Sequence, residues 1–254
     1  MTEQKLKIGL YADTGVAPNS YLQLKHHLSD SYTITKLKSS DIIAKTWPDD
    51  MRAIVMPGGA DVPYHQKLQG QGAANIRTFV ENGGIYIGVC AGSYFACREI
   101  HFTCNDGSVI QDNRNLAFFD GRCIGPTFGP YIEEGHLSAR LVPIVINNKI
   151  LKAYYNGGGY FEDAQDSDDV SVLGRYHENN QPMALHCKVG KGYAFLCAVH
   201  PEYDQARIKK ILTSKVAGYQ ILEQIMQDGI SPQINDWFLK HLGNFTKNNS
   251  NIEI

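Results

Sequence analysis

Short apolar runs alternate with amphipathic segments in the first part of the chain. Each run ends at glycine, proline or polar residues, which is typical of buried strands. The segments between them carry apolar residues at helical spacing. The expected strands cover residues 7–11, 32–35, 52–56 and 85–89, and the expected helices cover 19–28 and 71–82. This alternation predicts an α/β fold in which right-handed crossovers join the strands of a mostly parallel central sheet.

The second half of the chain has a weaker pattern. Residues 103–148 are richer in glycine, asparagine, proline and β-forming residues, and they predict irregular strands or an inserted subdomain. Two apolar arms flank Gly190-Lys191-Gly192 and predict a β-hairpin. The arms cover residues 182–189 and 193–199, and the helices expected after them cover 205–227 and 232–242.

Length and charge fit one soluble domain with a small-molecule partner. The chain has 254 residues, which is enough for one large core, and we expect a single domain over 1–245 with a polar C-terminal tail over 246–254. The 24 basic and 26 acidic residues give a net charge of −2. This balance gives no reason to expect nucleic acid or a membrane surface as a partner. A homo-oligomer is left open.

The N-terminus and the cysteines indicate a reducing compartment. No apolar stretch approaches the ~20 residues that cross a bilayer, and the first residues lack the pattern of a secretion signal. We therefore expect a cytoplasmic protein. The six cysteines are irregularly spaced without a Cys-x-x-Cys pair, so we expect free thiols that belong to the core, Cys90 excepted, and neither a metal site nor a cofactor.

Cys90 is the strongest candidate for chemistry. It follows an apolar strand and stands between Gly88 and Gly92. Small neighbours of this kind suit the sharp strand-to-helix turn that exposes a nucleophile. A helix that starts just after Cys90 would favour the thiolate through its partial positive charge. A lone cysteine is more often a buried apolar residue, but the glycines favour an activated thiol.

His200 and Glu202 are the candidate partners of that thiol. His200 ends a second apolar run, where an imidazole can deprotonate a thiol at a neighbouring strand end. Glu202 is two residues further on and can orient the imidazole, which gives a Cys-His-Glu triad. The alternatives are a core histidine bonded to a carbonyl and a solvated carboxylate at a helix start.

Backbone N–H groups near Cys90 are candidates for an oxyanion hole. The N–H of Ala91 directly follows the nucleophile, and Gly59 lies in a glycine loop at the end of a neighbouring strand. Glycine suits this role because its backbone can approach a substrate closely. A plain tight turn at Pro57-Gly58-Gly59 is the alternative.

Several other residues are candidates for substrate binding. They follow predicted strands or combine aromatic edges with glycines, as a pocket wall does. Asp13 and Ser20 could equally cap a helix, and the glycine run after Asn156 could be an ordinary loop. The candidates are Asp13, Ser20, Gly58, Tyr155, Asn156 and Gly157.

Four segments of the chain resemble the N-terminal domain of eukaryotic-type biotin-protein ligases. They are residues 17–20, 55–61, 79–96 and 155–161, and the likeness runs from about residue 6 to about 240. That domain is similar to class I glutamine amidotransferases. The resemblance implies a flavodoxin-like three-layer α/β/α sandwich with a cysteine site.

The chain departs from these relatives at two points. It contains no Gly-Arg-Gly-Arg adenylate-binding loop, so we do not expect it to transfer biotin by itself. It also lacks the glutamine that glutaminases often carry shortly after the nucleophile. We expect a cysteine-dependent hydrolase or amidotransferase-like protein that acts on a small amide or acyl compound. A non-catalytic binding or regulatory module and a redox-sensing thiol protein are the alternatives.

Overall fold

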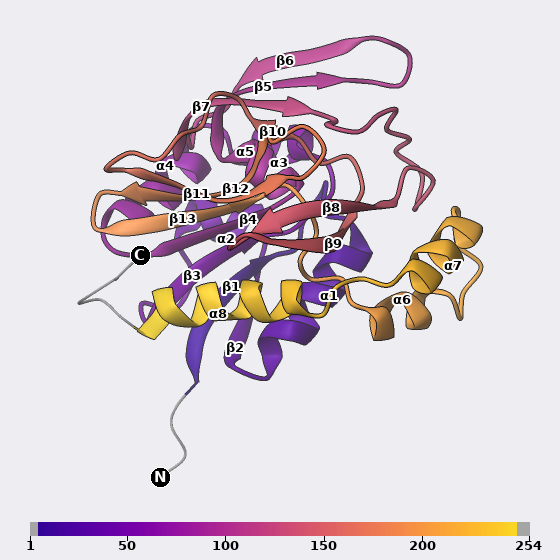
Figure 1. Ribbon diagram of the computed structural model, residues 1–254. Coiled ribbons are helices and arrows are strands. Elements are labelled where there is room, and N and C mark those ends of the chain that lie inside the picture. Colours follow the sequence, from indigo (N-terminus) through magenta and orange to yellow (C-terminus); the bar gives the residue numbers. More distant parts are fainter. Residues whose placement is uncertain (1–4, 248–254) are drawn as a thin grey trace.

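A mixed nine-stranded β-sheet forms the centre of the molecule (Figure 1). The computed structural model describes residues 5–247. The strand order is β2-β1-β3-β4-β13-β12-β11-β8-β9; pairing is parallel from β2 to β13 and antiparallel from β13 to β9. The strands are β1 (Leu6–Tyr11), β2 (Tyr32–Leu37), β3 (Met51–Met56), β4 (Ile85–Val89), β8 (Arg140–Ile146), β9 (Lys149–Tyr155), β11 (Val170–Tyr176), β12 (Pro182–Val189) and β13 (Gly192–Cys197).

Helices cover both faces of this sheet. The chain moves from β1 to β2 in one direction and from β3 to β4 in the other, so right-handed crossovers place α1 and α4 on opposite faces. Adjacent residues of a strand also point to opposite faces: Tyr86 bonds to α5, whereas Phe195, paired with Ile87, packs on Trp237 of α8. The helices are α1 (Pro18–Ser29), α2 (Ser39–Ala44), α3 (Asp61–Leu68), α4 (Gln71–Glu81), α5 (Ala91–Phe95), α6 (Gln205–Ile211), α7 (Tyr219–Asp228) and α8 (Gln233–Lys247).

A smaller four-stranded sheet stands at one end of the molecule (Figure 1, top). Its order is β10-β7-β5-β6, and β5 and β6 form its outer hairpin. The strands are β5 (Cys97–Thr103), β6 (Val109–Asn113), β7 (Phe119–Gly125) and β10 (Tyr160–Phe161). Because β5 follows α5 directly, this sheet lies next to the end of β4 that carries Cys90.

The structure confirms the α/β, flavodoxin-like class expected from the sequence. The strands expected over 7–11, 32–35, 52–56 and 85–89 are present, and the weakly patterned region 103–148 contains β6, β7 and β8. The central sheet also contains β8, β9 and β11. The alternation of strands and helices in the first part of the sequence did not indicate their antiparallel pairing.

The helix expected over 205–227 is wrong as a single element. It divides into α6 and α7, because Gly218 has a φ of 83° and turns the chain before α7. A Cβ at Gly218 would lie 2.5 Å from the carbonyl carbon of His136, so the turn needs glycine. At the C-terminus, residues 246 and 247 of the expected tail lie in α8, and 248–254 lie outside the described residues.

No helix within residues 5–247 has the length and apolar character needed to cross a membrane.

Candidate active site

Cys90 occupies a sharp turn between β4 and α5. Its backbone has φ 47° and ψ −104°, a conformation that costs energy for a residue with a side chain. The backbone N–H of Cys90 donates to the Cys197 carbonyl at 2.8 Å, and the Ser93 hydroxyl donates to the Cys90 carbonyl at 2.7 Å. These bonds fix the strained residue from both sides, as in the nucleophile turn that the sequence predicts.

The glycines beside Cys90 allow this turn. A Cβ on Gly92 would lie 2.2 Å from the Met56 carbonyl oxygen, and one on Gly88 would lie 2.5 Å from the Gly92 carbonyl oxygen. Both distances are far shorter than a van der Waals contact. The glycine spacing is therefore a steric requirement of the tight packing between α5 and the ends of β3 and β4.

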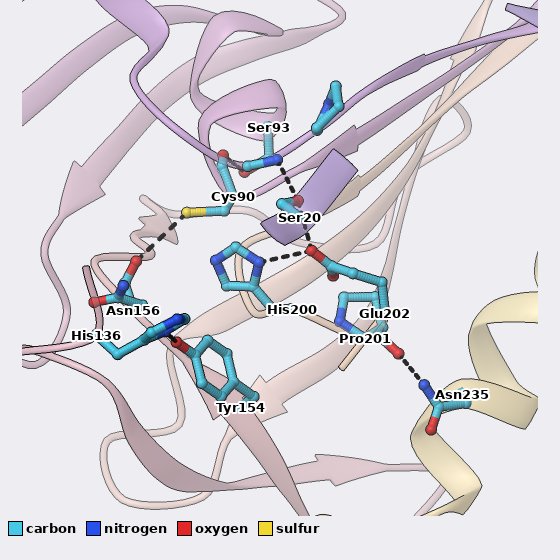
Figure 2. A network of polar contacts seen from close by, with 12 residues as sticks. Ser20, Cys90, Ser93, His136, Tyr154, Asn156, His200, Pro201, Glu202 and Asn235 are labelled. Atoms are coloured by element: carbon cyan, nitrogen blue, oxygen red, sulfur yellow. Dashed lines mark hydrogen bonds and ion pairs between the residues drawn. The ribbon is translucent and has the colours of Figure 1, made fainter. Parts of the chain in front are cut away.

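His200 and Glu202 lie beside Cys90 as a hydrogen-bonded pair. The backbone N–H of His200 donates to the Tyr154 carbonyl at 3.0 Å, which ties the residue to the end of β9. Nδ1 of His200 is 2.8 Å from Oε1 of Glu202, and Glu202 is completely buried. Figure 2 shows the imidazole ring between the sulfur of Cys90 and this carboxylate, with its other edge toward the sulfur.

The surroundings of His200 favour the imidazolium. Burial lowers the pKa of His200, but the nearby charges of Glu202 and Cys90, with hydrogen bonds to both, outweigh burial and raise it to about 10. A histidine that stays protonated at neutral pH beside a thiol stabilises the thiolate form. A thiol, an imidazole and a carboxylate thus lie in the order that a nucleophile, a proton carrier and an orienting residue need.

Ser20 bonds to the same Glu202 oxygen as His200. Its hydroxyl donates to Oε1 of Glu202 at 2.7 Å and accepts from the Gly58 N–H at 2.9 Å. Ser20 is completely buried. It thus holds the orienting carboxylate, a position that differs from the substrate contact expected from the sequence.

Gly58 allows the imidazole to approach the end of β3. A Cβ at this position would lie 2.5 Å from Cε1 of His200 and 3.2 Å from the Ser20 hydroxyl oxygen. Gly59 has a φ of 146°, and a Cβ there would lie 2.0 Å from the Gly15 carbonyl oxygen. Each glycine is therefore needed where the loop after β3 meets α1 and His200.

The two candidates for the oxyanion hole lie at the same cavity as Cys90. Gly59 and Ala91 both line the cavity that reaches the thiol. Within residues 5–247, their N–H groups donate to no protein acceptor. Free N–H groups beside a nucleophile are able to hold a developing oxyanion.

A cavity of about 550 Å³ opens onto Cys90. Its walls come from the loop after β3, from the start of α5, from the β5–β6 hairpin and from residues 131–133. Aromatic and aliphatic side chains predominate, among them Tyr94, Phe102 and Tyr131. The sequence analysis missed the last two because they lie in or beside the weakly patterned region 103–148, where no periodicity marks an inward face.

The candidate substrate residues fall into two groups. Asn156 and Gly157 line the cavity, and the Asn156 carbonyl accepts from the Cys90 thiol at 3.7 Å. The cavity lining, among described residues, does not include the other four, which are Asp13, Ser20, Gly58 and Tyr155.

Asp13 and Tyr155 bond to other parts of the fold instead. The Asp13 carboxylate accepts from the Ser39 hydroxyl at 2.6 Å, and hydrogen bonds from Ser39 are the main reason that the pKa of Asp13 falls to about 2. Tyr155 is buried, and its hydroxyl donates to the Gly158 carbonyl at 2.7 Å. Asp13 therefore fixes the start of α2, and Tyr155 fixes the loop that carries Asn156.

Cys104 corrects the expectation that the other cysteines belong to the core. It is partly exposed and lines the same cavity as Cys90, because it sits at the end of β5 where the hairpin turns. The remaining four are buried thiols. In the part of the chain that the structure describes, no group of three or more His, Cys, Asp or Glu side chains is placed to hold a metal ion.

A second buried histidine lies behind the site. Nδ1 of His136 is 2.6 Å from the Tyr154 hydroxyl, and Nε2 is 3.1 Å from the Asn19 amide nitrogen. The Tyr154 ring contacts His200 edge-on, with 5.6 Å between ring centroids, and stacks on Tyr203 at 4.2 Å. Tyr154 and Tyr203 thus both pack edge-on against the His200 ring, and Figure 2 shows Tyr154 next to His136.

Comparison with known sequences shows the family of the chain. The profile of the family described as "Biotin-protein ligase, N terminal" matches residues 6–242. An uncharacterized protein of Chlamydia muridarum is 34% identical over 209 residues, which cover 78% of this chain and 80% of that protein. The biotin–protein ligase of Schizosaccharomyces pombe is 32% identical over 182 residues, 68% of this chain, but the match spans only 29% of the ligase.

Solved structures with the same fold include glutamine amidotransferases. PurLQS of Thermotoga maritima has a TM-score of 0.58 at 15% identity, with 94% of this chain and 100% of that chain covered. A glutamine amidotransferase of the same organism has a TM-score of 0.57 at 11% identity and covers 97% of this chain and 100% of its own. At these identities the likeness shows the fold.

Proposed function

The chain belongs to the biotin-protein ligase N-terminal family, a class I glutamine amidotransferase-like domain, and from this premise we propose that it is a cysteine-dependent hydrolase or amidotransferase-like enzyme. Its substrate is a small amide or acyl compound. The observation that carries the proposal is the strained Cys90 in the wall of a cavity, with the His200–Glu202 pair beside it.

The proposed reaction forms and then breaks a thioester. The Cys90 thiolate attacks the carbonyl carbon, and the N–H groups of Gly59 and Ala91 hold the resulting oxyanion. The tetrahedral intermediate collapses as the C–N or C–O bond breaks, and protonated His200 gives its proton to the leaving group. Water, deprotonated by His200, then attacks the thioester; the acid leaves, and the thiol is regenerated.

Glu202 acts through His200 in this scheme. Its bond to Nδ1 keeps the opposite nitrogen toward Cys90 and stabilises the imidazolium between the two proton transfers. Biotin transfer is not part of the proposal, because the chain carries no Gly-Arg-Gly-Arg loop and its match spans 29% of the yeast ligase.

An activated ester tests the proposal without knowledge of the natural substrate. The Cys104→Ser protein is mixed with p-nitrophenyl acetate, release of p-nitrophenol is followed, and the modified residue is located by mass spectrometry. We expect a burst that matches the enzyme concentration and an acetyl group on Cys90. With His200→Gln, acylation should slow by roughly 10²- to 10⁴-fold.

Two other results would overturn it. If Cys90→Ala releases p-nitrophenol as fast as the parent protein, or if the thiol is inert, a binding or regulatory module explains the fold better. If dilute peroxide converts Cys90 to a sulfenic acid while no acyl group is ever found there, a redox-sensing thiol is the better account.

A further inference from the structure

The charges around the cavity are all of one sign. Asp61, Asp106 and Glu133 line it, and among the described residues of its wall none is lysine, arginine or histidine. The chain as a whole is nearly neutral, so this is a local property. Asp61 is compensated, because its carboxylate is 2.7 Å from Arg114, which lies outside the lining. Two acidic side chains of the lining, Asp106 and Glu133, therefore remain without a counter-charge in the lining. Both are exposed, and we call this part of the cavity wall the rim.

The two rim carboxylates come from different segments of the cavity lining. Asp106 is in the β5–β6 turn, where its carboxylate accepts from the backbone N–H and the hydroxyl of Ser108 at 2.9 and 2.6 Å. These bonds lower the pKa of Asp106, which keeps it ionised. Glu133 lies in the segment after Tyr131 and is exposed to solvent. A ligand in the cavity therefore lies near two carboxylates.

The inner wall is aromatic. Phe102 contacts Tyr131 edge-to-face with 5.6 Å between centroids, and Tyr94 contacts Phe102 at 5.8 Å. Burial, with the nearby charges of Cys90 and Glu133, raises the pKa of Tyr131 to about 12, so its ring carries a neutral hydroxyl. Aromatic faces attract ammonium groups and apolar carbons, and they give no compensation to an anion.

We infer that the substrate acted on by Cys90 is an amide or acyl compound whose remaining body is apolar and uncharged or positively charged, and that it carries no carboxylate or phosphate near the reacting group. This inference rests on the proposed function of the same site. A carboxylate here would lose its water without gaining a counter-charge. A free amino acid with a side-chain amide, such as glutamine, keeps its α-carboxylate and is therefore disfavoured.

Methanethiosulfonates of different charge test this inference. The Cys90 thiolate attacks the sulfur of the reagent, a disulfide forms, and a sulfinate leaves. Three reagents are compared in the Cys104→Ser protein: the neutral methyl reagent, the cationic trimethylammonium-ethyl reagent and the anionic sulfonato-ethyl reagent. Each rate is divided by the rate of the same reagent with 2-mercaptoethanol, which removes the intrinsic difference between them.

The corrected rate should be highest for the cation and lowest for the anion. The interaction of two unit charges about 10 Å apart in water changes a rate roughly twofold. Each rim carboxylate speeds the cation by this factor and slows the anion by the same factor, so it makes the ratio of their corrected rates roughly fourfold at low salt. The separation should shrink in 0.5 M salt because the Debye length falls well below 10 Å. An anionic reagent that reacts as fast as the cationic one would overturn the inference.

Rim variants show where the selectivity comes from. In the Asp106→Asn/Glu133→Gln protein the cation-to-anion ratio should fall toward one, whereas Glu134→Gln, next in sequence but not in the lining, should leave it unchanged. A ratio that the double variant does not alter would also overturn the inference. A thiol that reacts slowly with all three reagents is a failure of the proposed function instead, so the two failures are distinguishable.

Discussion

The Ser20 hydroxyl donates to Oε1 of Glu202 at 2.7 Å, the same oxygen that lies 2.8 Å from Nδ1 of His200. A residue near the start of the chain thereby holds a carboxylate 182 positions later. Both side chains are completely buried, so water does not replace the bond. The triad therefore depends on the docking of α1.

Ser20→Ala should reduce the free energy of unfolding by about 1–3 kcal/mol. The change removes a donor from the buried Glu202 and leaves the Gly58 N–H without an acceptor. Urea denaturation measures the effect. Ser29→Ala is the matched control because Ser29 is an exposed serine on the same helix, where a change of no more than about 0.5 kcal/mol is expected. Equal effects of the two substitutions would contradict this role of Ser20.

Gly58→Ala should displace the His200 ring, because the new methyl group would lie 2.5 Å from Cε1. An ordinary thiol is less than about 1% ionised at pH 6, so loss of the imidazole should slow alkylation of Cys90 at that pH by about 10- to 100-fold. Gly243→Ala is the control, since a Cβ there meets no atom within 4 Å. The steric argument fails if Gly58→Ala and the control react alike.

Arg114→Met should cost about 3–5 kcal/mol of stability, because it leaves Asp61 as a buried charge without its partner. The Arg114 side chain is 1% exposed, and burial raises the pKa of Asp61 although Arg114 opposes this. Arg98→Met breaks the exposed pair with Asp120 and should cost no more than about 1 kcal/mol. Thermal and urea unfolding measure the stability losses of the two variants. A loss for Arg114→Met that does not exceed the loss for Arg98→Met would mean that Asp61 is well hydrated.

His136 should make the protein less stable in mild acid. Burial, with a smaller contribution from the charge of His200, lowers the pKa of His136 to about 4, against about 6.5 in an unfolded chain. Between these values the unfolded state binds more protons, so the stabilisation present above pH 6.5 is lost as the pH falls toward 4.

His136→Gln should therefore flatten the fall in unfolding free energy between pH 6.5 and 4, whereas His26→Gln, a change at an exposed histidine, should leave it unaltered. Urea titrations at several pH values supply the comparison. A His136→Gln protein with the slope of the parent would show that the buried imidazole is protonated without cost.

The fold and the contacts of His200 with Cys90 and Glu202 were predictable because local signals carry them. Cys90 is marked by its flanking glycines, and His200 by the end of an apolar run. The partners of Ser20 and Asp13 were not predictable, because a short polar residue after a strand can cap a helix, contact a ligand or bond to a distant residue. Phe102 gave no signal either, since the pairing of β5 with β7 decides which way it faces. Tyr131 lies between β7 and β8, where no strand periodicity marks an inward face.

The claim that Cys90 and His200 act as one nucleophile–base pair is tested most directly by the pH dependence of alkylation. Iodoacetamide is added to the Cys104→Ser protein between pH 5 and 10, with and without His200→Gln, and the modified Cys90 peptide is quantified. The account predicts that alkylation of the parent persists at pH 6 and that His200→Gln slows it there by about 100-fold, to the rate of an ordinary thiol. Identical profiles that rise together near pH 8.5 would contradict it.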